Sequence, residues 1–273
     1  MKYFILLLIG LLPLTTLSQE IDISVNTEGI VATDDGAQES DSDSAKETKP
    51  IVDQSVPSVA FVPKHALEKF NQRDKSTAID LEVDKLYRRA HAQQTEGSIG
   101  LAIQTYYKII SKNPDYEKAR ISLAQVLAVK GDYSAIISVL MPATENKHSH
   151  WSAWYWLGVA FMKQGKFEMA IQATEEALSR NVESVDLWLL RALIEQETDD
   201  HHSALQLLSA AEHLAPNHPN IVLNKAISNE AIGQINLALV NYSNYLRLVK
   251  GTSNRAIPNK VVLDRIARLR TFN

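Results

Sequence analysis

The sequence contains no cysteine, and this absence removes several kinds of chemistry at once. Disulfide bonds, thiol catalysis, cysteine-ligated zinc and a lipid-modified cysteine are all excluded. The fold must therefore be held by its hydrophobic core alone. Glycine (10 of 273 residues) and proline (9) are also scarce, which favours helix over sheet.

Enzyme signatures are missing as well. The sequence has no GxSxG nucleophile turn, no P-loop, no HExxH helix and no dinucleotide-binding glycine pattern. Eight histidines are present, including the pairs His148/His150 and His201/His202, but no carboxylate has a spacing that would complete a metal set. We therefore expect a non-enzymatic protein with no cofactor and no metal.

The first 18 residues have the pattern of a secretory signal peptide. Lys2 precedes an apolar run from Tyr3 to Leu12, and small residues precede a cleavage point near Ser18. The run is shorter than the roughly 20 residues that cross a bilayer, so cleavage is favoured over the alternative of an uncleaved anchor. The chain is expected to be periplasmic or secreted, meeting the membrane only through this segment.

Charge is unevenly distributed along the chain, whose formal net charge is -4. Residues 19–60 hold ten acidic residues, two lysines and no aromatic side chain, which predicts an acidic disordered segment. Residues 247–273 hold seven Lys/Arg against Asp264 alone. The acidic segment is either a solvated spacer or an arm for a basic partner, including this basic end. No nucleic-acid reading motif accompanies the arginines, so no nucleic-acid partner is expected.

A 34-residue period runs through the middle of the chain and is clearest in Trp154–Leu178, where two apolar runs flank Gly165. The eighth position of each unit is small, which lets two helices approach closely. The turn position predicts left-handed backbone and falls on Gly97, Gly131, Gly165, Asp199 and Gly233. One helical hairpin cannot bury its own apolar face, so the pattern predicts a stack of hairpins.

The W-x2-L-G-x2-F sequence at residues 154–161, with Ala170-Ile171 downstream, resembles the tetratricopeptide repeat family. The resemblance covers residues 83–252 as five units: 83–116, 117–150, 151–184, 185–218 and 219–252. It implies an all-α, right-handed α-solenoid of about five helical hairpins. Where the central unit has Leu157, three other units carry Arg89, Arg191 and Lys225. We therefore expect the central hairpin to be the stability centre and the outer units to be looser.

Two flanking segments complete the predicted organisation. Residues 61–82 are expected to form an N-terminal flanking helix, and residues 61–73 either cap the first unit or dock elsewhere. Residues 253–273 are expected to form a C-terminal capping helix that starts at Pro258, because a terminal repeat leaves an apolar face bare. The apolar face of this helix would hold Val262, Ile266 and Leu269.

The resemblance also implies a function, because the first helices of such repeats line a groove that binds a protein or peptide. We expect a non-catalytic scaffold of the bacterial cell envelope, of the kind used in pilus, secretion or cell-wall assembly. The family's Lys/Asn/Arg clamp for a terminal carboxylate is not matched. The predicted groove residues are mostly apolar and aromatic: Tyr87, Ile121, Gln125, Tyr155, Val159, Met162, Leu189, Leu193, Leu223 and Ile227.

Two alternatives to a partner-binding groove remain open. These side chains could simply pack between neighbouring hairpins. The protein could also be a structural, self-associating homo-oligomer whose groove is filled by residues 61–73 or by another copy.

Overall fold

The structure is a computed structural model that describes residues 64–146, 148–251 and 257–271, with side chains from residue 80 onward. The predicted signal peptide (1–18) and acidic segment (19–60) lie outside the described residues. Every regular element in the described part of the chain is a helix. The helices are α2 (Lys64–Thr95), α3 (Ile99–Lys112), α4 (Glu117–Lys130), α5 (Tyr133–Thr144), α6 (Trp151–Lys163), α7 (Phe167–Arg180), α8 (Val185–Glu197), α9 (His201–Leu214), α10 (Pro219–Ala231), α11 (Ile235–Leu248) and α12 (Asn259–Arg270).

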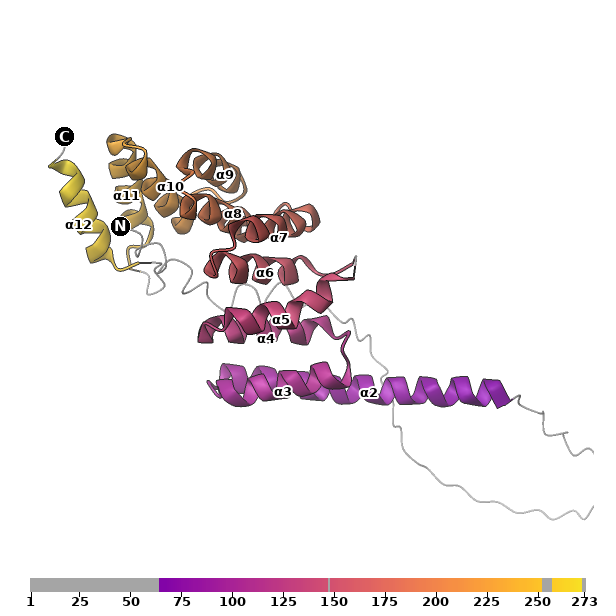
Figure 1. The fold of residues 1–273 in the computed structure, drawn as a ribbon. Coiled ribbons are helices and arrows are strands. Elements are labelled where there is room, and N and C mark those ends of the chain that lie inside the picture. Colours follow the sequence, from indigo (N-terminus) through magenta and orange to yellow (C-terminus); the bar gives the residue numbers. More distant parts are fainter. Residues whose placement is uncertain (1–63, 147, 252–256, 272–273) are drawn as a thin grey trace, which may run out of the picture.

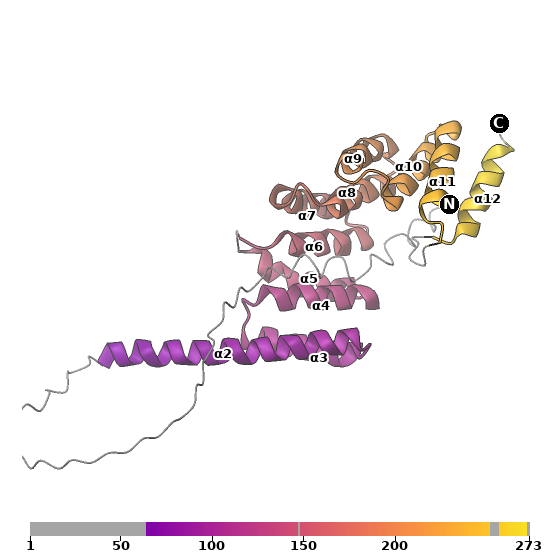
Figure 2. The same ribbon diagram turned by 180° about the vertical axis from the view of Figure 1, so that it is seen from behind.

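The helices pair into antiparallel hairpins that stack in chain order, as Figure 1 and the reverse view in Figure 2 show. The hairpins are α2–α3, α4–α5, α6–α7, α8–α9 and α10–α11, and the second helix of each contacts the first helix of the next. An apolar face that one hairpin cannot cover is thus covered by its neighbour. The predicted all-α helical solenoid is confirmed.

The turns inside the hairpins have the left-handed backbone that the repeat pattern predicts. Gly165 has φ 72° between α6 and α7, and glycine adopts this conformation without steric cost. In the next hairpin Asp199 has φ 62° despite its side chain, at a cost of about 1 kcal/mol. The α8–α9 turn is therefore the strained member of the series.

Helix α2 differs from the expected separate flanking helix. It runs without a break from Lys64 to Thr95, so residue 83 is not a helix boundary. The physical reason is that this stretch contains neither proline nor glycine to end a helix. The C-terminal part of α2 packs on α3, and its N-terminal part projects beyond the stack in both ribbon views.

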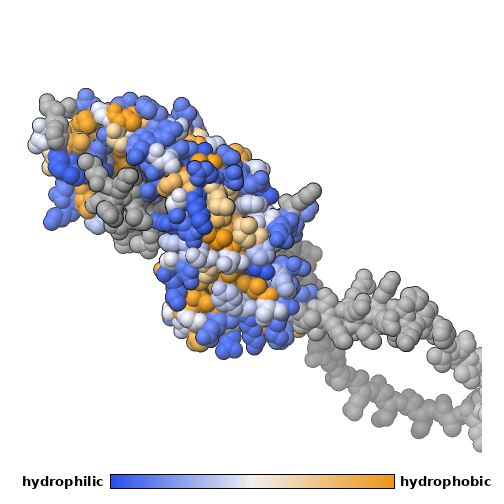
Figure 3. All heavy atoms as spheres, in the orientation of Figure 1, coloured by the Kyte–Doolittle hydropathy of each residue, from blue (hydrophilic) through white to orange (hydrophobic). Residues whose placement is uncertain are grey.

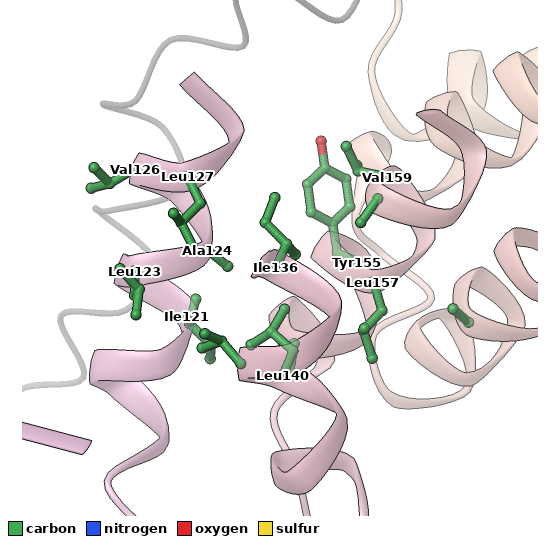
Figure 4. Packing of buried hydrophobic residues seen from close by; sticks show 14 of the residues in the cluster. Ile121, Leu123, Ala124, Val126, Leu127, Ile136, Leu140, Tyr155, Leu157 and Val159 are labelled. Atoms are coloured by element: carbon green, nitrogen blue, oxygen red, sulfur yellow. The ribbon is translucent and has the colours of Figure 1, made fainter. Parts of the chain in front are cut away.

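The hydrophobic core is divided into three clusters along the stack. The largest runs from Val83 in α2 to Ile194 in α8, so it joins the first three hairpins to the fourth. Figure 4 shows part of this cluster, where Ile121 of α4 points toward Leu140 of α5. A second cluster joins α8, α9 and α10, and a third joins α10, α11 and α12. The continuous apolar seam therefore belongs to the N-terminal half of the solenoid.

Helix α12 packs against α11 at the end of the stack. Val262, Ile266 and Leu269 are at most 7% exposed, so the predicted apolar face is buried. Arg265 is not on the solvent side. It donates hydrogen bonds to Glu230 of α10 (3.0 Å) and to the Tyr242 hydroxyl of α11 (2.7 Å). The end of the solenoid is thus joined by a charged contact as well as an apolar one.

Candidate partner-binding surface

The first helices of consecutive hairpins form the inner layer of the stack. Helix α4 contacts α6, α6 contacts α8, and α8 contacts α10, although each pair is separated by a complete helix in the sequence. Helices that touch across units lie on the shorter, inner side of a curved stack. The positions predicted to line a groove are on these helices and on α2.

Nearly all of the predicted groove residues are withdrawn from solvent. Tyr87 is half-buried, and each of the others is at most 9% exposed. These nine are Ile121, Gln125, Tyr155, Val159, Met162, Leu189, Leu193, Leu223 and Ile227. The structure therefore places them in the inner layer as closely packed side chains, not as an open apolar surface.

The structure brings only some of these residues together. The largest core cluster contains five of them: Ile121, Tyr155, Val159, Met162 and Leu193. Tyr87 packs against this cluster. Tyr155 and Val159 lie side by side on α6, one helical turn apart (Figure 4). Leu189 belongs to the α8–α10 cluster, while Leu223 and Ile227 belong to the last cluster. The candidate surface is thus centred on α4, α6 and α8.

Three buried polar side chains interrupt this apolar layer. The Nε2 of Gln125, the Oγ of Ser152 and the Oε1 of Gln196 are buried without a hydrogen-bond partner. Each of the three residues is at most 4% exposed. A buried polar atom without a partner costs about 1–3 kcal/mol. Trp156 Nε1 on α6 and Asn224 Oδ1 on α10 are buried without a partner as well, so the inner helices α4, α6, α8 and α10 all carry such atoms.

The amide of Gln196 is only partly satisfied by the protein. Its Nε2 donates to the carbonyl oxygen of Asn224 (3.0 Å) and to the Ser228 hydroxyl (2.7 Å), which joins α8 to α10. These bonds fix the orientation of the amide and leave its oxygen without a donor. Gln196 is therefore held in place by its two hydrogen bonds to α10.

Tyr155 is the central aromatic residue of the layer. Burial raises the pKa of its hydroxyl well above the ordinary tyrosine value, and the negative charge of Asp186 adds to the shift. Its ring lies edge-on to Trp156, with the ring centroids 5.2 Å apart. Tyr155 therefore stays neutral and offers a ring and a hydroxyl, not a charge.

Charged groups stand at the C-terminal ends of α6 and α8. Burial lowers the pKa of Lys163, and the negative charge of Glu197 partly offsets the shift. Burial likewise raises the pKa of Glu197, against the effect of Lys163. These opposite charges stabilise each other at the helix ends.

Two polar residues of the inner layer, Ser152 and Gln196, are not among the groove residues predicted from the sequence. Ser152 lies one turn before Tyr155, and Gln196 lies one turn after Leu193. Their only sequence signal is their place in the repeat, where they align with residues as different as Lys118 and Met162. Their lack of a hydrogen-bond partner becomes visible only in the folded chain.

The described residues show no other kind of site. Among them no group of three His, Cys, Asp or Glu side chains could hold a metal ion. No helix in this part of the chain is both long enough and apolar enough to cross a membrane. On the face in Figure 3, apolar atoms lie in several separate patches between polar ones.

The architecture of stacked helical hairpins with small residues at their contacts defines a helical-repeat solenoid. The model of the family described as "Tetratricopeptide repeat" matches residues 151–183, which form the central hairpin. Comparison with curated protein sequences finds no match.

Solved structures of the same architecture cover most of the described chain. TTC0263, a tetratricopeptide repeat protein of Thermus thermophilus, has a TM-score of 0.55 and 17% identity over 69% of this chain and 99% of its own. PilF of Pseudomonas aeruginosa has a TM-score of 0.56 and 15% identity over 71% and 93%. YrrB, described as a tetratricopeptide repeat protein with an unusual peptide-binding site, has a TM-score of 0.53 and 14% identity over 69% of this chain and 97% of its own.

The central hairpin matches the tetratricopeptide repeat family, and the described chain has the fold of solved tetratricopeptide repeat proteins. Its fold is that of a protein-interaction module, and scaffolds of this family are generally non-catalytic. At 14–17% identity, the structural neighbours show the fold alone.

Proposed function

We propose that this protein is a non-catalytic scaffold that binds a partner protein or peptide in the inner layer formed by α4, α6 and α8. The observations that carry the proposal are the contacts of α4 with α6 and of α6 with α8 across the intervening helices, and the largely apolar side chains of this inner layer.

The chemistry of the layer favours an uncharged ligand segment. Tyr155, Val159 and Met162 line one face of α6 and carry no charge at neutral pH. A charged ligand side chain placed there would lose its hydration without gaining a counter-ion. A ligand segment with apolar side chains fits this layer better than a charged one. The unbranched Met162 can adapt its shape to such a ligand.

We further propose that the scaffold works in the bacterial cell envelope. The support is the pattern of residues 1–18, with Lys2, an apolar run and small residues before Ser18. Because the sequence contains no cysteine, the protein needs no oxidising enzyme to fold in an exported compartment.

The groove can be tested with two matched substitutions. Met162→Gln places a polar amide in the inner layer, whereas Met169→Gln makes the same change on α7 at a residue that is 49% exposed. Partners captured from an envelope fraction by the unchanged chain are identified by mass spectrometry, and their affinity for each variant is measured. We expect Met162→Gln to weaken binding about tenfold or more and Met169→Gln to leave it unchanged. Equal retention by both folded variants would contradict the groove assignment.

Self-association is the second candidate function, and the projecting part of α2 favours it. While α2 remains one helix, its residues 64–73 lie along the projection and cannot fill the groove of the same chain. The sequence analysis predicted that the groove is filled either by residues 61–73 or by another copy. The projection of α2 supports another copy.

A further inference from the structure

Helix α2 extends well beyond the stack of hairpins. Lys112, the last residue of α3, forms an ion pair with Glu82 of α2 (3.1 Å), so the contact between the two helices ends near residue 82. The preceding residues of α2, 64–81, project from the stack as a helix in Figure 1 and Figure 2. At 1.5 Å per residue the projection is about 27 Å long. A single helix of this length is marginal in water, because most helical stability comes from packing against a partner.

The projection carries an apolar stripe on one side. Residues three and four positions apart share a side of a helix. Four apolar residues have this spacing, with one acidic residue at the centre of the set: Leu67, Phe70, Asp74, Ala78 and Leu81. At about 100° per residue, their directions fall within about 80° of one another around the helix axis. Leu81, at the base of the projection, is 55% exposed, so the described chain leaves it largely uncovered.

The stripe lies on the side of α2 that faces away from the stack. Val83 and Ala90 are fully buried in the largest core cluster, and their mean direction is about 170° from the centre of the stripe. Where α2 enters the stack, the side that carried the stripe becomes charged and exposed at Lys85 and Arg88. The stripe is therefore confined to the projection, where a second molecule can approach it.

The stripe is self-complementary about its centre. When two copies of the helix lie antiparallel with Asp74 at a two-fold axis, each residue is opposite the one that lies equally far on the other side of Asp74. Leu67 is then opposite Leu81 of the second copy, and the large Phe70 is opposite the small Ala78. A large residue opposite a small one lets two helices interdigitate. In a parallel pair, Phe70 would instead be opposite Phe70 and Ala78 opposite Ala78.

We propose that the projecting parts of α2 from two copies of this chain pair as antiparallel helices through this stripe. The dimer is isologous, because both copies use the same surface. The stack of each copy lies on the far side of its own α2, and the two stacks lie at opposite ends of the paired helices, so they do not collide. The pairing is independent of the inner layer formed by α4, α6 and α8.

Asp74 fixes the register of the pair and weakens it. A polar residue at one position of an apolar helix contact disfavours shifted registers at a cost in stability. In this pair the two carboxylates meet at the axis and repel each other. The contact spans residues 67–81 of each helix, or about 21 Å, which is short for a permanent dimer. We therefore expect a dimer that dissociates on dilution.

The absence of cysteine makes the pairing directly testable by disulfide trapping in the full chain. Asp74→Cys places one thiol of each copy at the axis, so mild oxidation should convert most of the chain to a linked dimer. Ser76→Cys is the control, because position 76 lies about 160° from position 74 around the helix axis. It should give little linked product.

The direction of the paired helices is tested with Leu67→Cys and Leu81→Cys. Each variant alone should remain largely unlinked. An equal mixture of the two should form a linked dimer, because Leu67 of one copy is opposite Leu81 of the other. Linkage of each variant with itself but not with the other would show a parallel pair and overturn the proposal.

Light scattering over a concentration series measures the pairing without a cross-link. The unchanged chain should pass from the mass of one chain to the mass of two as concentration rises. Phe70→Asp should raise the concentration of half dimerisation at least about a hundredfold, because each copy would bring a charge into the apolar contact. Val240→Asp on α11, at a residue that is 64% exposed, is the control and should not change this concentration. Asp74→Asn should lower it about fivefold, because the repulsion at the axis is removed.

Three further results would overturn the proposal. They are a chain that stays single at every concentration, equal linkage of Asp74→Cys and Ser76→Cys, and a dimer that survives Phe70→Asp. If the chain stays single and Phe70→Asp abolishes capture of an envelope partner, the stripe binds a different protein and self-pairing is wrong. The groove is tested separately by Met162→Gln, so a failure of the pairing leaves the groove proposal standing.

Discussion

The central hairpin and the two hairpins that follow it are built from the same repeat but joined by different chemistry. In α6, Leu157 and Phe161 are at most 7% exposed and belong to the largest core cluster. The equivalent positions in α8 hold Arg191 and Glu195. The same fold therefore has an apolar junction at its centre and a polar one toward its C-terminus.

The basic residues at the polar junctions form ion pairs, so they are not unpaired charges at positions that favour leucine. Arg191 forms an ion pair with Glu195 on its own helix and approaches Glu175 of the preceding hairpin to 4.0 Å. In the next unit Lys225 pairs with Glu212 of α9 at 2.7 Å. Arg191 and Lys225 thus each find a carboxylate on the hairpin before their own.

The difference shows how a repeat can vary its junctions without losing its register. A partly exposed ion pair is worth about 0–1 kcal/mol, whereas a fully buried leucine contributes about 1.5–3 kcal/mol. The polar junctions keep neighbouring hairpins aligned but stabilise them less. That the outer units are looser than the central hairpin therefore remains a prediction, now with a physical reason.

The largest expected effect is at Leu157. Leu157→Ala removes a fully buried side chain at the centre of the apolar cluster and should lower the free energy of unfolding by about 2–5 kcal/mol. Urea unfolding measures the loss. Leu237→Ala on α11 is the matched control, because Leu237 is 53% exposed and its truncation should change stability little. Similar losses at both sites would remove the distinction between the central hairpin and the rest.

A smaller effect is expected at Gly158, where α6 and α7 approach closely. A Cβ atom there would lie 2.8 Å from the Thr174 hydroxyl and 3.2 Å from a methyl group of Leu190. Thr174 is fully buried, and its hydroxyl donates to the Ala170 carbonyl oxygen at 2.7 Å. Gly158→Ala should therefore cost about 1–3 kcal/mol despite the better helix propensity of alanine.

The control for this prediction is Gly100→Ala in α3, where the added Cβ would meet no atom within 4 Å. That variant should gain about 0.5–1 kcal/mol, since alanine is the better helix former. Thermal and urea unfolding of both variants give the comparison. If Gly158→Ala also raised the free energy of unfolding, the close approach of α6 and α7 would not restrict the size of the side chain at residue 158.

The smallest effect is expected at the polar junction. Lys225→Met replaces the basic residue by an apolar side chain of similar length and leaves Glu212, which is 41% exposed, free to face water. The free energy of unfolding should change by less than about 1 kcal/mol. Its dependence on salt should decrease, because one screened ion pair is lost. Unfolding at low and high ionic strength checks both statements, and a loss comparable to that of Leu157→Ala would show that this ion pair stabilises its junction as strongly as a buried leucine.

Much of the fold could be predicted because it depends on local pattern. The turn at Gly165 follows from one glycine between two apolar runs, and the buried face of α12 follows from the spacing of Val262, Ile266 and Leu269. The boundary at residue 83 was not predictable in this way. The repeat register marks where a unit begins, but no proline or glycine interrupts the helix between Lys64 and Thr95.

The candidate surface was less predictable than the fold. The repeat register placed Tyr155 and Val159 on the inner layer, but it gave no measure of how deeply they are buried. It also gave no reason to select Ser152. Burial and hydrogen bonding depend on which side chains of other hairpins surround an atom, and a periodic pattern holds no information on that.

By itself, the sequence determined that this protein is a stack of helical hairpins, because the 34-residue spacing of small and apolar residues permits no other way to bury them. It also excluded cysteine chemistry and supplied no enzyme motif. Tertiary structure alone decided where the core divides into clusters and how Arg191 and Lys225 are paired. Those features arise between hairpins, where residues far apart in the chain meet at distances that no local pattern specifies.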